Sequence, residues 1–472
     1  MLHNTEFLSV LGFDLAWDPA YYEDVDLCLK LRLIGLQTFY CPQSTVTHIE
    51  GATSSDTSHN LSLNNIIAIN KAKFCARWGA FLQSSGVEKP NLIPFSPEPI
   101  VRGTGKPQVA IFTPYNITPG GGERYFLTIA ESFRGLAEVT LITPRPFSRT
   151  RILTMGRDFG LRLDHIDLVT QNNYGVHQQF DLAFVIGNEI LPPIGGIATH
   201  NIFICQFPFP FESENQARHA RPYWDDYDLV LTYSSFVRRH VTEKAESFRL
   251  PSLAIEILAP PVPLLEVGLK TRARILHVGR FFTGGHCKRQ DVLIGAFRRL
   301  IESGVEAELH LAGSTHPEPE HRAYYSELVE SALGLPVYFH ANCSAGKLRE
   351  LYMGSAIYWH ATGFGDDVEL EPYKTEHFGI SVVEAMSAGC IPVVFAAGGP
   401  AEVVEDNVTG FHFRTIGELC TITQKLIEDT SSREMSVFAN AAAEAARFYD
   451  ESVFKAHVRT LAARFISFSG VA

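Results

Sequence analysis

The segment from Glu376 to Val394 constrains the fold of this chain more than any other. It reads E-H-F-G-I-S-V-V-E-A-M-S-A-G-C-I-P-V-V: an acid in a predicted loop, an apolar helix that carries a second acid, and a buried strand. Loop, helix and strand in this order are typical of one edge of a nucleotide-binding α/β domain, because the free N–H groups at the helix start can bind a phosphate. The two acids alone establish no function, since acids near helix starts commonly stabilise the helix dipole.

As a whole, the segment closely resembles the E-x7-E motif of retaining glycosyltransferases of family 4. These enzymes have the GT-B fold, so the resemblance implies an α/β protein with two Rossmann-like domains facing a cleft. It also implies a catalytic role for Glu376, whose carboxylate would bond hydroxyls of the donor sugar. The ribose, phosphate and sugar of the donor would further contact residues in and just after the motif: Glu384, Phe378, Gly379, Ile380, Gly398 and Gly399.

A second motif, V-G-R-(x)7-K-R-Q-D-V-L-I-x-A-F, begins at Val278. It resembles the diphosphate clamp of the same family, which implies that Arg280 and Lys288 hold the donor phosphates during catalysis. Two cations near a turn are often only solvated, but here they suit a leaving group whose negative charge must be stabilised. Fixed cations do this without a metal ion, so we expect neither a metal nor a cofactor. By the same resemblance, Asn342 lies in a loop near the nucleobase.

A glycine-rich turn lies near the start of the first half of the catalytic region. A predicted strand at 109–113 precedes Gly120, Gly121 and Gly122, and a helix follows them. A plain tight turn is one interpretation, but the resemblance places this loop across the cleft from the donor, near the acceptor and the phosphates. Gln206 stands where many relatives carry a histidine that lines the cleft. Glutamine cannot take up a proton, which argues against an acid/base role there.

Three phenylalanines follow Gln206 in the segment F-P-F-P-F, at 207, 209 and 211. Packing in the core is the favoured interpretation. The alternative is a rim that touches a lipid or an apolar acceptor, which would give the protein a peripheral contact with a membrane.

The order of apolar runs predicts the domain limits. Strands alternating with helical stretches predict a first Rossmann-like acceptor domain at 107–265 and a second, donor-binding domain at 266–440. A proline-rich hinge at 258–263 would join them, and a C-terminal helix at 441–472 would cross back to the first domain. The polar, glycine-containing loop at 361–375 suggests a flap over the donor site.

Residues 1–82 form a separate α+β segment in this interpretation, and the Pro-, Gly- and Ser-rich stretch 83–106 is a linker. The pattern G-F-D-x6-Y-Y-E-D-V-D-L resembles the closing third of a family 2 glycosyltransferase, which has the GT-A fold. By that resemblance Asp24 would match a general base and His48 would lie near a metal-bound diphosphate. The nucleotide-binding half of that family, with its Asp-x-Asp motif, does not precede it. We therefore expect a truncated, catalytically silent remnant or the tail of a longer protein.

The overall composition excludes some classes of function. A net charge of −12 argues against general binding to nucleic acid. Eight scattered cysteines without zinc spacing indicate a reducing, cytoplasmic compartment. The N-terminus resembles no signal peptide, and no apolar run reaches the roughly 20 residues of a membrane span. We expect a cytoplasmic protein, at most peripheral to the inner face of the membrane.

The sequence thus predicts a retaining glycosyltransferase that uses a nucleoside diphosphate sugar and a glycan or lipid-linked acceptor in surface polysaccharide synthesis. The variant H-x-K-R-Q-D resembles relatives that use GDP-mannose. Two alternatives stay open: a nucleotide-sugar epimerase with the GT-B fold, and a non-catalytic module that binds nucleotide sugars or assembles with partners. The sequence does not specify the linkage formed or the oligomeric state.

Overall fold

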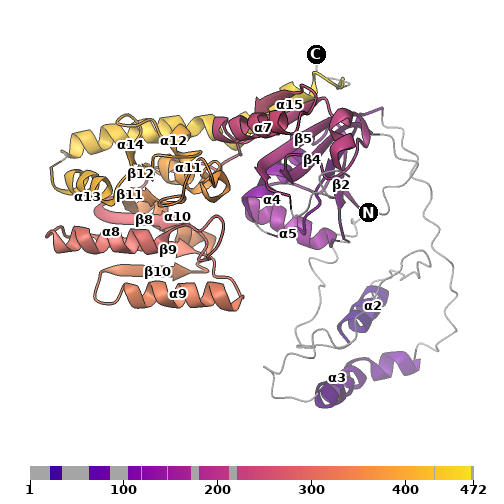
Figure 1. The fold of residues 1–472 in the computed structure, drawn as a ribbon. Coiled ribbons are helices and arrows are strands. Elements are labelled where there is room, and N and C mark those ends of the chain that lie inside the picture. Colours follow the sequence, from indigo (N-terminus) through magenta and orange to yellow (C-terminus); the bar gives the residue numbers. More distant parts are fainter. Residues whose placement is uncertain are drawn as a thin grey trace. The chain divides into compact units, whose positions relative to one another are not determined.

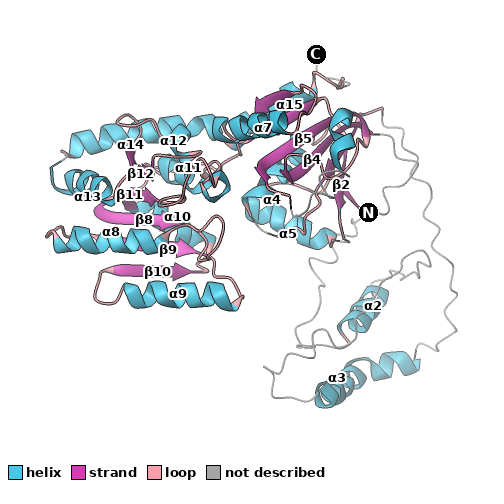
Figure 2. Cartoon of the chain, in the orientation of Figure 1, coloured by secondary structure: helices cyan, strands magenta, loops and turns pink. Residues whose placement is uncertain are grey.

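We describe a computed structural model of the chain that defines residues 22–33, 63–84, 105–118, 120–145, 147–171, 180–211, 220–429 and 431–468. The chain divides into two compact units, Met1–Thr104 and Gly105–Ala472. The second unit contains two parallel β-sheets, each with its own helices and its own core (Figure 1). The α/β class predicted from the sequence is therefore confirmed (Figure 2).

The first sheet has the strand order β3-β2-β1-β4-β5-β6-β7, with every pair parallel. Its strands are β1 Gln108–Phe112, β2 Glu138–Thr143, β3 Ile166–Thr170, β4 Phe180–Glu189, β5 Ala198–Phe209, β6 Leu229–Thr232 and β7 Ala254–Ile257. The helical segments between them are α4 Gly121–Ser132, α5 Arg149–Phe159, η2 Arg221–Asp226 and α7 Ser235–Ser247. The central strands are nearly continuous apolar runs, because helices cover both faces of a parallel sheet.

Apolar runs at 109–113, 138–142, 182–186, 201–205 and 229–233 predict β1, β2, β4, β5 and β6, but no such run was assigned to β3 or β7. The two missed strands form opposite edges of the sheet. Asp167 interrupts the apolar run of β3, and Glu256 interrupts that of β7. An edge strand keeps part of its surface in water, so it lacks the continuous apolar run that identified the inner strands.

The second sheet has the order β10-β9-β8-β11-β12-β13, again all parallel. Its strands are β8 Thr271–Val278, β9 Glu308–Gly313, β10 Val337–Ala341, β11 Ser355–His360, β12 Ile391–Phe395 and β13 Phe411–Phe413. Its helical segments are α8 Gln290–Glu302, α9 Pro319–Ser331, α10 Ala345–Gly354, η3 Pro372–Lys374, α11 Ile380–Ser387, α12 Pro400–Val403, α13 Ile416–Gln424 and η4 Lys425–Asp429. Strand order reverses between β8 and β11, and ligands of such sheets bind at the carboxyl ends of strands beside that point.

The C-terminal helix predicted at 441–472 is in fact two helices. They are α14 Ser432–Ala446 and α15 Glu451–Ala462, separated by the 3-10 turn η5 Arg447–Tyr449. Ala442 and Ala446 of α14 pack in the core around α11, whereas Phe454 and Val458 of α15 pack in the core of the first domain. Asp450 begins α15 by accepting the N–H of Ser452 (2.8 Å). The chain therefore crosses back at 447–450 rather than at 441.

The N-terminal unit is described over two helices, α2 Glu23–Leu33 and α3 Leu63–Ser84. Apolar spacing at 27, 28, 31 and 34 before Gly35 predicts the first, and residues 70–78 in the second resemble the helix that ends family 2 enzymes. Asp26 is buried between them and accepts hydrogen bonds from the indole N–H of Trp78 (2.7 Å) and from Arg77 (3.1 Å). Asp24, which the resemblance to family 2 singled out, is exposed. The predicted strands of this segment and His48 lie outside the described residues.

We expect Asp26→Asn to loosen α3 while Asp24→Asn leaves it unchanged. Asparagine keeps the shape of Asp26 but loses the charge that strengthens the bonds to Arg77 and Trp78, a loss of about 2 kcal/mol. Amide hydrogens of α3 should then exchange roughly 30-fold faster, as measured by mass spectrometry of the full chain. Equal protection in the two variants would contradict a pivotal role for Asp26.

Candidate functional site

A cavity of about 350 Å³ lies where the two domains of the second unit meet. Its lining includes residues of the first domain (Gly121, Gly122, Asn188, Gln206, Phe209 and Tyr233) and of the second (Arg280, Phe282, Gly285, His286, Glu376, His377, Phe378, Gly379 and Ile380). The structure thus brings together residues from motifs that are far apart in the sequence. Of the predicted site residues, Gly121, Gly122, Gln206, Arg280, Glu376, Phe378, Gly379 and Ile380 line this cavity.

The glycine-rich turn allows the two domains to approach closely at the cavity. Gly120 is the N-cap residue of helix α4. Its backbone is extended, and no side chain caps the helix. A Cβ atom on Gly121 would lie 2.7 Å from Cδ1 of Ile380 in the other domain, and one on Gly122 would lie 3.1 Å from Nε2 of Gln206. Any side chain at Gly121 would therefore push the domains apart or displace Ile380.

Glu376 and Lys288 form an ion pair at the edge of the cavity. Lys288 Nζ lies 2.5 Å from Glu376 Oε2, and their side chains are only 15% and 17% exposed. His360 Nε2 lies 3.4 Å from the same carboxylate oxygen. Burial alone would raise the pKa of Glu376, but the Lys288 ammonium and the bond from His360 hold that pKa well below its ordinary value. Glu376 is therefore a carboxylate at neutral pH, and Lys288 is held beside the cavity.

Arg280 presents a second cation to the cavity. Its guanidinium lies over the ring of Phe282, 4.9 Å from the ring centroid, and among the described residues no acid forms an ion pair with it. Buried Gln290 fixes the turn that carries Arg280, because its Nε2 donates to the carbonyls of Gly279 (3.2 Å) and Arg280 (3.1 Å). This cation is available to an anion in the cavity.

The start of helix α11 supplies further donors for an anion. Gly379 occupies the N-cap with a left-handed backbone (φ 97°), and no side chain caps the helix. The backbone at Gly379 and Ile380 lines the cavity. Uncapped N–H groups at a helix start attract negative charge, so this end of α11 and Arg280 offer positive potential to the same space.

Two histidines line the cavity that sequence reasoning did not assign to the site. The His377 ring stacks on Phe207 (centroids 4.0 Å apart, 4° between planes), and His286 meets His377 edge-on at 4.2 Å. Burial, with the nearby Lys288, lowers the pKa of His286 to about 4, and burial with His286 lowers the pKa of His377 well below its ordinary value. Both imidazoles are neutral at pH 7. His286 lies in the H-x-K-R-Q-D motif and His377 directly follows Glu376. Their positions in these two motifs were the sequence signal that could have assigned them to the site.

The core interpretation of the phenylalanine segment is confirmed for Phe207, which is 2% exposed. Phe209 and Phe211 are half-buried and pack against the same core cluster. Phe207 and Phe209 belong to strand β5, which also carries Gln206 into the cavity.

The other predicted donor-binding residues lie around the cavity rather than in its lining. Glu384 accepts the hydroxyl of Tyr352 (2.8 Å), and burial raises its pKa. Asn342, with a left-handed backbone (φ 52°), bonds the backbone N–H and the hydroxyl of Thr315. At positions 398 and 399, packing requires glycine. A Cβ atom at either position would lie 2.3 Å from the backbone of the 376–378 segment, so this loop can support Glu376 only if both are glycine.

The loop at 361–375, predicted as a flap, is anchored at both ends. Phe364 packs against Phe395 and Phe413, and Asp366 lies 3.8 Å from Arg289. Tyr373 faces Phe209 of the first domain, with ring centroids 6.4 Å apart. The loop thus contacts both domains beside the cavity.

The first domain is joined to the second at the start of α7. Ser234 caps this helix and also donates its hydroxyl to the carbonyl of His377 (2.7 Å). Glu402 of the second domain accepts the backbone N–H groups of Ser235 (2.8 Å) and Phe236. A carboxylate from one domain thus occupies the positive end of a helix dipole in the other.

We expect Glu402→Gln to weaken this contact by about 1 kcal/mol, because the amide loses the charge that favours the helix start. The unfolding temperature should fall by roughly 2–4 °C, and small-angle X-ray scattering should show a larger radius of gyration. Glu405→Gln, three residues on and exposed, is the matched control and should change neither quantity. Identical scattering from the two variants would show that Glu402 does not hold the domains together.

Among the described residues, one group of His, Cys, Asp or Glu side chains has the spacing of a metal site: His316, Glu318 and His321. None of them lines the cavity. None of the helices in the described ranges combines the length and the apolar character needed to cross a membrane.

Comparison with known proteins finds a family match for the second domain. Residues 267–441 match the family model "Glycosyl transferases group 1". This part of the chain is therefore similar to the group 1 glycosyl transferases, in agreement with the resemblance seen in the sequence. Relatives include the "GDP-Man:Man(3)GlcNAc(2)-PP-Dol alpha-1,2-mannosyltransferase" of Xenopus laevis, 28% identical over 242 residues, and that of Neurospora crassa, 27% identical over 265 residues. The alignments cover 48% and 50% of this chain and 46% and 45% of the relatives, so the chain spans about half the length of these curated proteins.

Solved structures confirm the GT-B arrangement of two Rossmann-like domains. The crystal structure of Anabaena Alr3699/HepE in complex with UDP and glucose has a TM-score of 0.55 and 16% identity, covering 76% of this chain and 99% of that one. The crystal structure of TarM has a TM-score of 0.57 and 10% identity, with the same coverage. At these identities the likeness concerns the fold.

Proposed function

We propose that this protein is a retaining glycosyltransferase that moves a sugar from a nucleoside diphosphate sugar to a glycan or lipid-linked acceptor. The observation that carries the proposal is the shared cavity. Arg280, the Lys288–Glu376 pair and the uncapped start of α11 gather at it from the second domain, and Gly121 and Gly122 close it from the first. Such a site suits a ligand that is anionic at one end and rich in hydroxyls at the other.

The geometry suggests how donor binding changes the ion pair. In the structure the charge of Lys288 is neutralised by Glu376. A diphosphate that contacts Arg280 and the start of α11 would compete for Lys288, and the freed Glu376 carboxylate could then accept hydrogen bonds from sugar hydroxyls. When the bond to the sugar breaks, the leaving diphosphate gains charge that these fixed donors stabilise. A metal ion is not needed for this role in the proposal.

Retention is proposed from the resemblance to the retaining enzymes of family 4. Same-face transfer without a covalent intermediate is proposed because the matched motifs contain no obvious covalent nucleophile. The leaving phosphate would take the proton of the acceptor hydroxyl on the same face of the sugar. Gln206, which lines the acceptor side of the cavity, cannot serve as a base, and this agrees with phosphate in that role. Neutral His286 and His377 remain available to bond hydroxyls of sugar or acceptor.

GDP-mannose is the first donor that we propose, because the matched curated relatives are named as GDP-Man-dependent mannosyltransferases. Their names also include a lipid-linked glycan, which favours a membrane-borne acceptor and a cytoplasmic protein peripheral to the membrane. We further propose that the catalytic unit belongs to family 4 with domains near 107–265 and 266–440, and that residues 1–82 are a family 2 remnant joined by the linker 83–106.

The proposal is tested by incubating the full chain with GDP-mannose or UDP-glucose and a lipid-linked oligosaccharide, and measuring release of nucleoside diphosphate. NMR of the product gives the configuration of the new bond. We expect GDP release that depends on acceptor and an α-linked product. Conversion of the sugar without loss of the nucleotide would indicate an epimerase, and no turnover of any donor would favour a binding module.

A further inference from the structure

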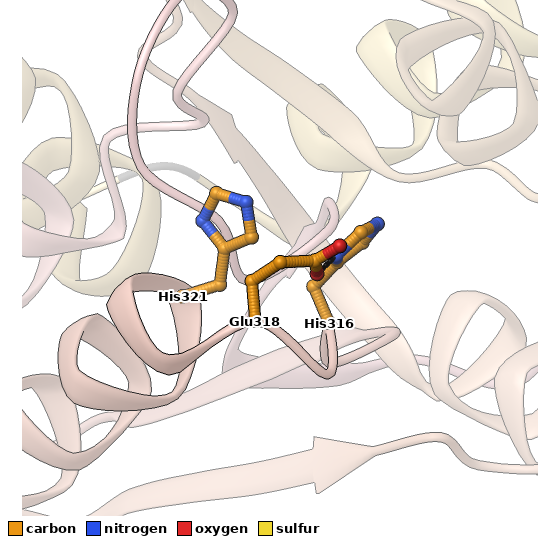
Figure 3. Close-up of side chains that lie close together, drawn as sticks. All are labelled: His316, Glu318 and His321. Carbon is orange, nitrogen blue, oxygen red and sulfur yellow. Dashed lines mark hydrogen bonds and ion pairs between the residues drawn. The ribbon is translucent and has the colours of Figure 1, made fainter.

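Three potential metal ligands converge where the loop that follows β9 enters α9. His316, Glu318 and His321 each offer a ligand atom, and these atoms all lie within 4.8 Å of one another. Figure 3 shows the Glu318 side chain extending between the two imidazole rings. The rings of His316 and His321 have centroids 5.0 Å apart and stand nearly perpendicular, at 89°.

The local backbone explains why these side chains converge. Glu318 is the N-cap of α9 with an extended backbone, and Pro319 begins the helix. The Glu318 carboxylate does not cap the helix; it turns back to His316 Nδ1, with which it forms an ion pair. His321 lies in the first turn of α9, which brings its ring back over the N-cap. The helix start therefore fixes two of the three ligands.

The surroundings of His321 support a ligand role. Its Nε2 lies 3.7 Å from the carboxylate of Glu320, and its Nδ1 accepts the backbone N–H of Thr283 at 3.3 Å. Its ring also contacts Phe282 edge-on, with centroids 5.7 Å apart. Metal-binding histidines typically direct their second ring N–H to a carboxylate or carbonyl that orients the ring, and Glu320 is the carboxylate beside Nε2 of His321.

We propose that His316, Glu318 and His321 bind one divalent transition-metal ion such as Zn²⁺. Two imidazoles and a carboxylate are a donor set that suits zinc, nickel or copper and leaves coordination positions for water. Mg²⁺ prefers oxygen ligands in an octahedron and is a poor match. Because no member of the trio lines the cavity, the ion would act beside the transfer site and not in the transfer reaction.

Metal binding would act on the loop that carries Arg280. A neutral imidazole has one free lone pair on its ring nitrogens. A metal on Nδ1 of His321 would occupy that pair directly, and a metal on Nε2 would place the proton on Nδ1. In both cases the N–H of Thr283 loses its acceptor. Thr283 adjoins Phe282, which lines the cavity and stacks with Arg280.

Isothermal titration calorimetry of the untagged full chain with Zn²⁺, Ni²⁺ and Mg²⁺ tests the proposal. We expect one Zn²⁺ or Ni²⁺ site, no Mg²⁺ binding at this site, and at least a tenfold loss of Zn²⁺ affinity in His316→Ala and His321→Ala. His457→Ala, which removes an exposed histidine on α15, is the matched control and should bind as the natural chain does. Absence of a site in the natural chain, or equal affinity in all variants, would overturn the proposal.

Three further measurements keep the test valid if an alanine variant fails to fold. Glu318→Gln preserves side-chain size and should still weaken binding at least tenfold. Electron paramagnetic resonance with Cu²⁺ should show coupling to two imidazole nitrogens, one of which disappears in His321→Ala. Hydrogen exchange of the 281–285 backbone should accelerate with Zn²⁺. Unchanged exchange at full occupancy would contradict the displacement of Thr283, and a Cu²⁺ spectrum without imidazole nitrogens would contradict the ligand assignment.

Discussion

Replacing Glu376 with glutamine is expected to lower sugar transfer by about 10²–10³-fold, the scale seen when one preorganised hydrogen-bonding group is removed from a transition state. The amide is nearly isosteric but accepts weaker hydrogen bonds from sugar hydroxyls and lacks the charge that orients Lys288 (2.5 Å). Nucleoside diphosphate binding should persist or tighten, because Lys288 no longer has a competing carboxylate. Initial rates with GDP-mannose and calorimetry with GDP measure the two effects separately.

The matched control for this variant is Glu371→Gln, the same substitution at a carboxylate that pairs with Lys374 in the adjacent loop. It should transfer sugar at close to the natural rate. Full transfer activity in Glu376→Gln would remove Glu376 from the catalytic site. A variant that lost both binding and transfer would point to a purely structural role.

Lys288→Ala has the second large expected effect. Loss of one ammonium–phosphate contact should weaken nucleoside diphosphate binding by about 10- to 100-fold, because hydrogen bonds to charged groups contribute roughly 1.5–3 kcal/mol. Calorimetry with GDP measures this effect. Lys347→Ala, which removes a surface lysine paired with Glu350, is the control and should not alter affinity. Unchanged GDP affinity in Lys288→Ala would exclude Lys288 from the phosphate site.

The same variant should also lose stability in a pH-dependent manner. Lys288 holds the pKa of Glu376 below its ordinary value, so the pair stabilises the fold above that value and loses this effect as pH falls through the lowered pKa. Without Lys288, the effect of burial on the pKa of Glu376 is opposed only by the neighbouring histidines, chiefly through the bond from His360. The difference in unfolding free energy, about 2 kcal/mol at pH 7, should shrink as pH falls below about 4. A constant difference across this range would contradict the ion-pair assignment.

The sequence predicted the parts of the fold that rest on local patterns. The apolar runs of β1, β4 and β12 and the helical segment at α11 are visible along the chain, because buried parallel strands and their covering helices need apolar residues. The break between α14 and α15 was not predicted. Tertiary contacts cause the break. The N–H of Val262 donates to the carbonyl of Tyr449, and the two helices pack into two separate hydrophobic cores.

Only part of the site was visible from the sequence. The two cavity cations and Glu376 were identified by their motifs, but their pairing was not, since Lys288 and Glu376 are 88 positions apart. The histidines were missed because their place depends on tertiary contacts: His377 stacks on Phe207 of the other domain, and His286 meets His377 edge-on. The packing requirement at Gly399 was not visible either: its lack of a side chain lets the loop pack on Phe378.

Thermal unfolding of the full chain with GDP, UDP, ADP and dTDP, each with and without Mg²⁺, tests the central claim most directly. A nucleotide at about a hundred times its dissociation constant adds roughly 2.7 kcal/mol to the stability of the state that binds it. We predict a rise in unfolding temperature with GDP that is independent of Mg²⁺ and is lost in Lys288→Ala. No rise with any of the four nucleotides would contradict a nucleotide-sugar site in the cavity.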